Sequence, residues 1–200
     1  MITIIRNIIN FIFALFLFII LLPFIIIITF IIKIDSKGQA IFKQKRVGKY
    51  GKVFILYKFR TMRIDVDPNE QSPQNKNDSR ITSFGKFLRE SSLDELPQLI
   101  NVIKRDMNLV GPRPLLSWQA DEFSAYESRR LEVKPGITGL AQINGRGSLN
   151  WEEKIKYDIK YVENRNLMLD LKILLKTIKN VLAQDDIYEG DEGGWKTHGK

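Results

Sequence analysis

Residues 11–32, FIFALFLFIILLPFIIIITFII, form an apolar run without a single charged side chain. As a continuous helix these 22 residues would extend about 33 Å, enough to cross the hydrocarbon core of a bilayer. The run is too long for a secretory signal, and no cleavage site of small residues follows it. The sequence therefore predicts an amino-terminal membrane segment that is retained.

The flanks of this run indicate its orientation. Arg6 and the amino terminus precede it, whereas the residues after it are rich in lysine and arginine. The positive-inside rule therefore predicts that the main part of the chain lies in the cytoplasm. Pro23 leaves two alternatives open: an ordinary span that tolerates a proline, or a hairpin that turns back because both flanks prefer the cytoplasmic side. The basic residues after the run are Lys33, Lys37, Lys43, Lys45, Arg46, Lys49 and Lys52.

The length of 200 residues suits one compact domain in addition to the membrane segment. We expect a membrane segment over 1–33, a compact cytoplasmic domain over 34–183, and a flexible acidic, glycine-rich tail over 184–200. The polar segment 65–78 contains Pro68 and Pro73 and predicts an exposed loop that could close over a ligand.

The composition excludes several kinds of chemistry. The chain has no cysteine, and its single histidine, His198, lies in the tail. Disulfides, thiolate metal sites, histidine-dependent triads and histidine-ligated zinc are therefore not expected. Carboxylates, lysine, arginine, tyrosine and a bound metal remain. The net charge of +8 suits partners that carry phosphate, which leaves nucleic acid, anionic lipid and nucleotide ligands open.

Hydrophobic patterning after the membrane segment predicts a mostly α fold with a short β-hairpin. Thr82 and Asn150 are residue types that cap helix amino termini. Segment 134–146 is rich in glycine and predicts a loop held against the core. The expected strands are 40–46 and 52–62 around a turn at 48–51, and the expected helices are 82–90, 92–105, 116–131, 151–163 and a last helix that begins at Asp170.

The last predicted helix is amphipathic and basic. Its apolar stripe alternates with a lysine face, so two interpretations stay open: the stripe packs in the core, or the helix lies on an anionic membrane surface. The stripe consists of Leu171, Leu174, Leu175, Ile178, Val181 and Leu182, and the lysines are Lys172, Lys176 and Lys179.

Segment 92–98, SLDELPQ, places two adjacent carboxylates at the start of a predicted helix. One interpretation is structural: Ser92 and Glu95 form a capping box, and the helix dipole favours Asp94 in the first turn. The other is catalytic. Pro97 makes the first turn irregular, and the dipole keeps a carboxylate ionised, as a nucleophile or a ligand of Mg²⁺ must be.

Gly111-Pro112-Arg113-Pro114 presents an arginine from a stiff backbone, because the two prolines fix φ on either side of it. A planar guanidinium can bind two phosphate oxygens at once. The alternative is an ordinary arginine in a proline-rich turn. Lys58 and Arg60 alternate along a predicted strand, so both point to one side and could extend a basic wall.

Five blocks of sequence, in this order, resemble those of a known family. The chain is similar to the small monotopic phosphoglycosyl transferases, also called bacterial sugar transferases, from the apolar run to about Val181. The blocks are 58–62 (KFRTM), 78–82 (DSRIT), 92–98 (SLDELPQ), 106–114 (DMNLVGPRP) and 134–142 (KPGITGLAQ).

The resemblance implies transfer of a sugar 1-phosphate from a UDP-sugar to undecaprenyl phosphate with release of UMP, a reaction of the EC 2.7.8 type, at the first membrane step of surface glycan synthesis. It implies that Asp94 attacks the sugar-bearing phosphate to form a covalent intermediate, which the lipid phosphate then attacks. It further implies that Glu95, with Asp94 beside it, helps to hold Mg²⁺, and that Arg113 and Arg89 bind phosphate.

The resemblance also bears on the fold. It implies a re-entrant membrane helix broken at Pro23, with amphipathic interfacial helices, in the bacterial inner membrane, with the active site on the cytoplasmic face. Enzymes that act downstream, such as glycosyltransferases, would be partners. Two positions depart from the family pattern: Leu22 stands where a serine often precedes the proline, and Leu131 stands where a histidine is common.

Two other readings compete with a transferase. A membrane-tethered basic module would bind nucleic acid or anionic lipid and show salt-dependent binding without turnover. No nucleic-acid motif supports it, so we expect no nucleic-acid partner. An inactive scaffold for other glycan enzymes is the second, and the presence of Asp94, Glu95 and Arg113 argues against it.

Overall fold

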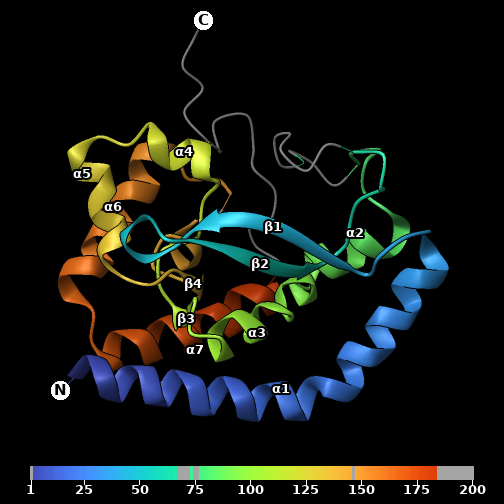
Figure 1. Ribbon diagram of the computed structural model, residues 1–200, viewed down its shortest axis with the longest axis horizontal. Coiled ribbons are helices and arrows are strands. Elements are labelled where there is room, and N and C mark those ends of the chain that lie inside the picture. Colours follow the sequence, from blue (N-terminus) through green and yellow to red (C-terminus); the bar gives the residue numbers. More distant parts are fainter. Residues whose placement is uncertain (1, 67–72, 74–76, 146, 184–200) are drawn as a thin grey trace, which may run out of the picture.

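The computed structural model describes residues 2–66, 73, 77–145 and 147–183. Most of the predicted loop 65–78 and the whole tail 184–200 lie outside the described residues. Figure 1 shows a long helix, α1 (Ile2–Asp35), running along one side of a domain built from short helices and two small sheets. The predicted class, mostly α with a short β-hairpin, is confirmed.

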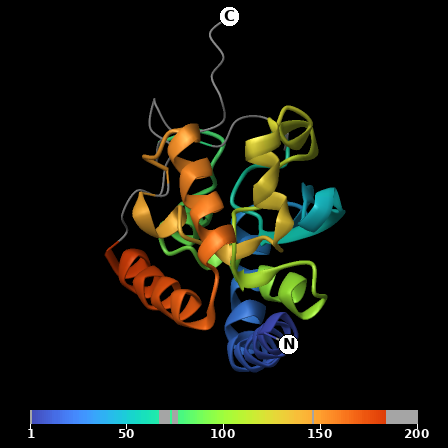
Figure 2. The same ribbon diagram turned by 90° about the vertical axis from the view of Figure 1, so that its left-hand side faces the viewer.

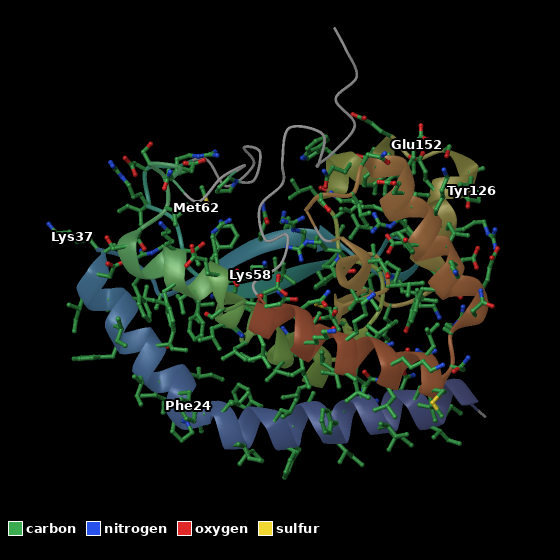
Figure 3. The ribbon with its side chains drawn as sticks, turned by 180° about the vertical axis from the view of Figure 1, so that it is seen from behind. Phe24, Lys37, Lys58, Met62, Tyr126 and Glu152 are labelled. Carbon is green, nitrogen blue, oxygen red and sulfur yellow. The ribbon has the colours of Figure 1, made fainter. Side chains whose placement is uncertain are left out.

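Helix α1 is the one helix in the described part of the chain that is long and apolar enough to cross a membrane. Only 11% of its most apolar window is buried, unlike the core helix of a soluble protein. Pro23 lies inside the helix, and Figure 3 shows a bend at the neighbouring Phe24. The re-entrant membrane helix expected with a break at Pro23 stays a prediction. The chain bends there as one continuous helix, because a proline removes a single backbone hydrogen bond.

The predicted hairpin is confirmed. Strand β1 (Ile41–Val47) pairs antiparallel with β2 (Val53–Phe59), around the 3-10 turn η1 (Lys49–Gly51). A second, parallel pair joins β3 (Asn108–Val110) to β4 (Gly136–Thr138). The expected loop 134–146 thus contains a strand, followed by the 3-10 helix η4 (Gln142–Asn144). The two backbones can approach this closely because Gly111 and Gly136 have no side chains. A Cβ on Gly136 would lie 2.0 Å from the Gly111 nitrogen.

Two helix starts agree with their predicted caps. Thr82 Oγ1 accepts a hydrogen bond from the Gly85 N–H at 3.0 Å and begins α2 (Ser83–Glu90). Asn150 Oδ1 accepts one from the Glu153 N–H at 2.9 Å and begins α6 (Trp151–Asn164). In both cases a side-chain oxygen satisfies a backbone donor that the helix itself leaves unpaired.

The expected continuous helix 116–131 is wrong. The chain forms α4 (Ser117–Asp121), α5 (Ala125–Ser128) and the 3-10 helix η3 (Arg129–Glu132) instead. The cause is local, because the Glu127 carboxylate accepts a hydrogen bond from the Ser124 N–H at 2.8 Å while Ser124 Oγ accepts one from the Glu127 N–H at 3.3 Å. This capping box starts a new helix in the middle of the segment.

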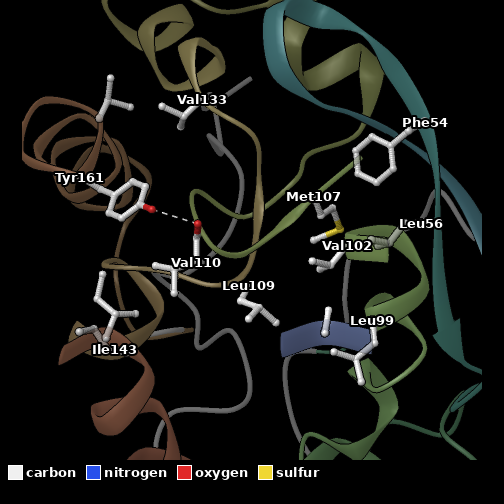
Figure 4. Packing of buried hydrophobic residues seen from close by; sticks show 13 residues of the cluster. Phe54, Leu56, Leu99, Val102, Met107, Leu109, Val110, Val133, Ile143 and Tyr161 are labelled. Carbon is white, nitrogen blue, oxygen red and sulfur yellow. Dashed lines mark hydrogen bonds between the residues drawn. The ribbon is translucent and has the colours of Figure 1, made fainter. Parts of the chain in front are cut away.

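The hydrophobic core includes α1 at two places. Figure 4 shows the main cluster, which gathers residues of the hairpin, α3 (Gln98–Ile103), β3, α6 and α7 (Leu167–Ala183), and Ala14 of α1 is fully buried in it. A second cluster packs Ile28 and Ile32 of α1 against Phe59 and Leu88. The domain therefore covers one face of α1 and leaves the other face apolar and exposed.

The apolar stripe predicted on the last helix lies mostly on the surface. Ile173 is fully buried, whereas the expectation of core packing is wrong for four stripe residues that are 51–80% exposed. Polar contacts decide which face of α7 points inward: Asp170 binds Arg6, and Thr177 Oγ1 lies 2.7 Å from Thr138 Oγ1. Figures 1 and 2 show α7 and α1 along the same side of the molecule. The exposed stripe residues are Leu171, Leu175, Ile178 and Leu182.

A buried polar network holds the amino-terminal end of α1 to the domain. Arg6 donates hydrogen bonds to Asp170 Oδ2 at 2.7 and 3.1 Å and to Tyr161 Oη at 2.8 Å. One turn later, Asn10 Oδ1 accepts a hydrogen bond from the Leu109 N–H at 2.7 Å. Because the carboxy-terminal half of α1 packs in the second cluster, both ends of this helix contact the same domain.

We expect Asp170→Asn to destabilise the protein strongly, because Arg6 would remain buried without its counter-charge. Breaking one partner of a buried ion pair costs about 3–5 kcal/mol. Thermal unfolding in detergent micelles measures the effect, and the exposed Asp121→Asn serves as a control that should leave the melting temperature unchanged. Equal melting temperatures for the two variants would contradict the role of the pair.

Candidate active site

The adjacent carboxylates lie on a short 3-10 helix, η2 (Leu93–Glu95), between α2 and α3. Ser92 precedes it with a φ of 55°, in the left-handed region, and in the described structure its side chain makes no capping hydrogen bond. The expected capping box of Ser92 and Glu95 is therefore wrong, and so is a helix that begins at Ser92. The regular helix α3 begins only after Pro97. Glu95 directs its carboxylate to the hairpin instead.

Both carboxylates share one lysine of the hairpin. Lys58 Nζ lies 2.8 Å from Glu95 Oε1 and 3.6 Å from Asp94 Oδ2. Arg113 Nη1 donates to the same Glu95 oxygen at 3.2 Å. The side chain of Asp94 is 12% exposed, whereas that of Arg113 is 53% exposed. The cluster thus joins β2, η2 and the turn after β3 into one site with a buried acid and an accessible arginine.

The environment of Asp94 perturbs its ionisation. Burial raises the pKa of the Asp94 carboxyl above its usual range, and Lys58 is the strongest charge that opposes this rise. The neighbouring Glu95 adds to the rise, while Arg89 and Arg113 oppose it. Burial thus favours the protonated carboxyl, and the three cations favour the ionised carboxylate that a nucleophile needs.

The position of Lys58 depends on a buried amide of α3. Asn101 is fully buried, and its Oδ1 accepts a hydrogen bond from the Tyr57 N–H at 3.1 Å. Its Nδ2 donates to the Ile55 carbonyl at 2.6 Å. These two hydrogen bonds pair with the edge of β2 as a neighbouring strand would. They fix β2 against α3, next to Lys58.

Arg89 approaches the site from the last turn of α2. Its Nε donates a hydrogen bond to Thr61 Oγ1 at 2.8 Å, and its charge acts on Asp94. Thr61 is buried, and its carbonyl accepts from the Thr82 N–H at 3.0 Å. The end of the hairpin and the start of α2 thus hold Arg89 near the carboxylates, as the resemblance implies.

Arg60 lies elsewhere, although it was expected to extend the basic wall of Lys58. Its guanidinium donates to the carbonyls of Ser36 and Lys37, each at 2.7 Å, and to Ser36 Oγ at 2.8 Å. These groups follow the end of α1. Gly38 has a φ of 110°, and a Cβ there would lie 2.4 Å from the Arg60 guanidinium. The structure therefore places Arg60 at the junction of α1 with the hairpin.

The proline-flanked turn that carries Arg113 is fixed by its carbonyl groups. Pro112 and Pro114 have no N–H to donate, so the orientation of the turn depends on what its oxygens accept. The donors come from β4, η3 and β1. The hydrogen bonds are Gly136 N–H to Pro112 O at 2.9 Å, Arg130 Nη2 to Arg113 O at 3.0 Å, Arg46 Nη1 to Pro114 O at 3.3 Å and Val47 N–H to Leu115 O at 2.9 Å.

The carboxylates fit a magnesium ion that is shared with a phosphate ligand. Within the described residues there is no group of three or more acidic, histidine or cysteine side chains that could hold a metal alone. Mg²⁺ does not need such a group, because it binds through one or two carboxylates together with water and phosphate oxygens. Glu95, with Asp94 beside it, could supply these carboxylates.

Sequence reasoning missed Thr61, Asn101 and Arg130. Thr61 lies next to Arg60 in segment 58–62, but the alternation along the predicted strand indicates only Lys58 and Arg60. Asn101 and Arg130 act on segments 44 and 17 residues away, so no local spacing marks them. Only the tertiary contacts reveal their part in the site.

The chain is similar in sequence to proteins of one known family. A family model described as "Bacterial sugar transferase" matches residues 1–184. The chain is 45% identical over 159 residues to "Uncharacterized sugar transferase EpsL" of Bacillus subtilis (strain 168), an alignment that covers 80% of this chain and 78% of that protein.

Two longer relatives carry names that state an activity. The chain is 43% identical over 166 residues to "Undecaprenyl-phosphate galactose phosphotransferase" of Salmonella typhimurium, covering 76% of this chain and 35% of the relative. It is 41% identical over 175 residues to "UDP-glucose:undecaprenyl-phosphate glucose-1-phosphate transferase" of Xanthomonas campestris pv. campestris, covering 83% and 36%. The chain thus spans about a third of the length of each of these two relatives.

The family match includes α1, the hairpin, both carboxylates and the arginine turn in one alignment. Together with the relatives of at least 40% identity, it identifies the chain as a member of the bacterial sugar transferase family.

Proposed function

We propose that this protein transfers a sugar 1-phosphate from a UDP-sugar to undecaprenyl phosphate and releases UMP. The observation that carries the proposal is the buried Asp94 carboxylate, which Glu95 adjoins and on which the charges of Lys58, Arg89 and Arg113 act. The names of the Salmonella and Xanthomonas relatives describe an activity of this type for those proteins.

The reaction proceeds in two displacements at one phosphorus atom. Asp94 first attacks the sugar-bearing phosphorus, forming a phospho-aspartyl bond, while the bond to the bridging oxygen breaks and UMP leaves with the electron pair. The phosphate of the lipid then attacks the same phosphorus, and Asp94 departs as a carboxylate. Displacement at phosphorus needs mainly alignment and neutralised charge, so a site without histidine suffices.

The cationic side chains and Mg²⁺ have separate roles in this reaction. Arg113, exposed on a rigid turn, binds the phosphate oxygens of the donor, and Arg89 supports the charge that develops there. Lys58 is the strongest charge that favours the ionised form of Asp94. When bound by Glu95, Mg²⁺ would neutralise diphosphate charge.

We further propose that the protein lies in one leaflet of the bacterial inner membrane, with its active site on the cytoplasmic face. Supporting observations are that both ends of α1 contact one domain and that α1 and α7, which both carry exposed apolar side chains, lie along the same side of the molecule (Figure 2). A straight helix of 34 residues would separate its ends by about 51 Å. The bend at Pro23 lets α1 enter the membrane as a re-entrant helix while it remains against the domain.

With this product, the protein would catalyse an early membrane step of surface glycan synthesis. A polyprenyl diphosphate sugar remains in the membrane and presents free sugar hydroxyls. Glycosyltransferases that extend a lipid-linked sugar are the class of enzyme that would consume it.

Variants of the three central residues test the reaction. We expect Asp94→Asn to abolish UMP release, because the nucleophile is lost, and Glu95→Gln and Arg113→Ala to reduce kcat/KM by about 10²–10³-fold. Purified enzyme in detergent, with Mg²⁺, undecaprenyl phosphate and a panel of UDP-sugars, provides the assay. The exposed Glu122→Gln is the control and should behave as wild type. Wild-type rates in Asp94→Asn would exclude the mechanism.

The pH dependence of kcat/KM tests the role of Lys58. Asp94 must be ionised to attack, so activity falls as the pH drops through its pKa, which burial raises above the usual value. Lys58→Met removes the strongest charge that lowers this pKa. The acid limb of the profile should therefore move to higher pH, whereas the exposed Lys52→Met should leave it in place. An acid limb that does not move in Lys58→Met would refute this role.

The topology of α1 can be tested with single cysteines, because the chain has none of its own. Ile4→Cys, before the apolar run, and Lys37→Cys, after α1, should both react with a membrane-impermeant maleimide in inverted vesicles and stay unlabelled in spheroplasts. Glu152→Cys in the domain reports the cytoplasmic side. Labelling of Ile4→Cys in spheroplasts alone would mean that α1 spans the membrane.

A further inference from the structure

A second buried ion pair lies behind the arginine turn. Arg130 of η3 and Asp158 of α6 pair through Nη2 and Oδ2, and their side chains are only 4% and 2% exposed. The Arg130 guanidinium also lies over the rings of Phe123 and Trp151, 5.8 and 5.6 Å from their centroids. The pair is therefore enclosed by aromatic groups and has little access to water.

The contacts of this pair are poorly suited to stabilise the folded protein. Arg130 Nε and Nη1 and Asp158 Oδ1 are buried and have no hydrogen-bond partner among the described residues. Burial also raises the pKa of the Asp158 carboxyl, against the opposing charge of Arg130. A buried ion pair repays its desolvation only when its remaining donors and acceptors are satisfied, and apolar replacement of such a pair is often neutral or stabilising. Another role would explain the pair better.

Arg130 also makes a specific contact with the candidate active site. The Nη2 atom that faces Asp158 also donates to the carbonyl oxygen of Arg113 at 3.0 Å. That carbonyl lies between Pro112 and Pro114, whose nitrogens cannot donate. Because the Arg113 side chain is 53% exposed, burial does not fix it, and its direction depends on its ion pair with Glu95 and on how its backbone is anchored.

We propose that Arg130 and Asp158 are positioning residues for Arg113: Asp158 orients the Arg130 guanidinium, and Arg130 anchors the Arg113 carbonyl so that the Arg113 side chain meets the donor phosphate. The inference rests on the phosphate-binding role proposed above for Arg113. It assigns to the pair a function in catalysis rather than in folding.

The test replaces the pair by apolar residues of similar size, Arg130→Met with Asp158→Leu. The melting temperature should stay the same or rise, while kcat/KM should fall by about ten- to a hundredfold, because a small displacement of a binding group is costly. In an Arg113→Ala background the same double change should have no further effect on kcat/KM. A merely structural role would lower activity equally in both backgrounds.

Hydrogen exchange supplies a readout that does not depend on activity. The amides of Gly136 and Val47 donate to Pro112 and Leu115, on either side of Arg113. Their exchange should accelerate in the apolar double variant. Arg130→Lys, which keeps a charge opposite Asp158 but lacks the planar fork, should also lose activity, and it carries the test where the double variant does not fold.

The matched control is Arg129→Gln with Glu163→Gln. This pair joins the same two elements, η3 and α6, at 2.9 Å, and both side chains are more than a third exposed. It should leave activity and exchange unchanged. Unaltered kcat/KM in Arg130→Met/Asp158→Leu, or a loss that persists in the Arg113→Ala background, would overturn the inference. Absence of transfer by the wild-type enzyme would instead refute the proposed function, and exchange would still report whether the pair anchors the turn.

Discussion

The contacts of Lys58 with Asp94 and Glu95 join the hairpin to the helical part of the protein, and the candidate site depends on them. Burying a carboxylate costs several kcal/mol unless a counter-charge lies close to it. The position of β2 relative to η2 is therefore constrained by charge as well as by packing. Asn101, which ties β2 to α3, makes the same arrangement rigid through neutral hydrogen bonds.

Helix α1 and the candidate site are connected through one short strand, β3. Asn10 of α1 accepts a hydrogen bond from the Leu109 N–H, and Tyr161, a partner of Arg6, donates to the Val110 carbonyl at 3.0 Å (Figure 4). Strand β3 leads directly into the turn that carries Arg113. The packing of α1 and the position of the arginine turn are thus parts of one structural unit.

The sequence predicted those features whose cause is local. The hairpin follows from alternating β-formers around a glycine-containing turn, and the caps at Thr82 and Asn150 need only a few neighbouring residues. The capping box at Ser92 had an equally good local pattern and is wrong, because Ser92 adopts a left-handed conformation and Lys58 and Arg113 attract the Glu95 carboxylate.

Features with distant causes could not be read from the chain. The β3–β4 pair depends on close approach of glycine backbones, and the inward face of α7 is set by partners on α1 and β4. Arg60 alternates with Lys58 along the chain as predicted. Its guanidinium donates hydrogen bonds to the carbonyls of Ser36 and Lys37, however, and therefore does not extend the basic wall. The resemblance to the family nevertheless predicts that the carboxylates and Arg113 belong to one site, although their proximity does not follow from local patterns.

The most direct test of Asp94 as a nucleophile is intact-protein mass spectrometry after incubation with Mg²⁺ and each UDP-sugar, without the lipid acceptor. A mass increase equal to one sugar phosphate less one water, absent in Asp94→Asn and removed by undecaprenyl phosphate, is the predicted result, and it would identify the donor at the same time. UMP release that requires the lipid, with no adduct for any donor, would contradict covalent catalysis and indicate direct transfer between the two substrates.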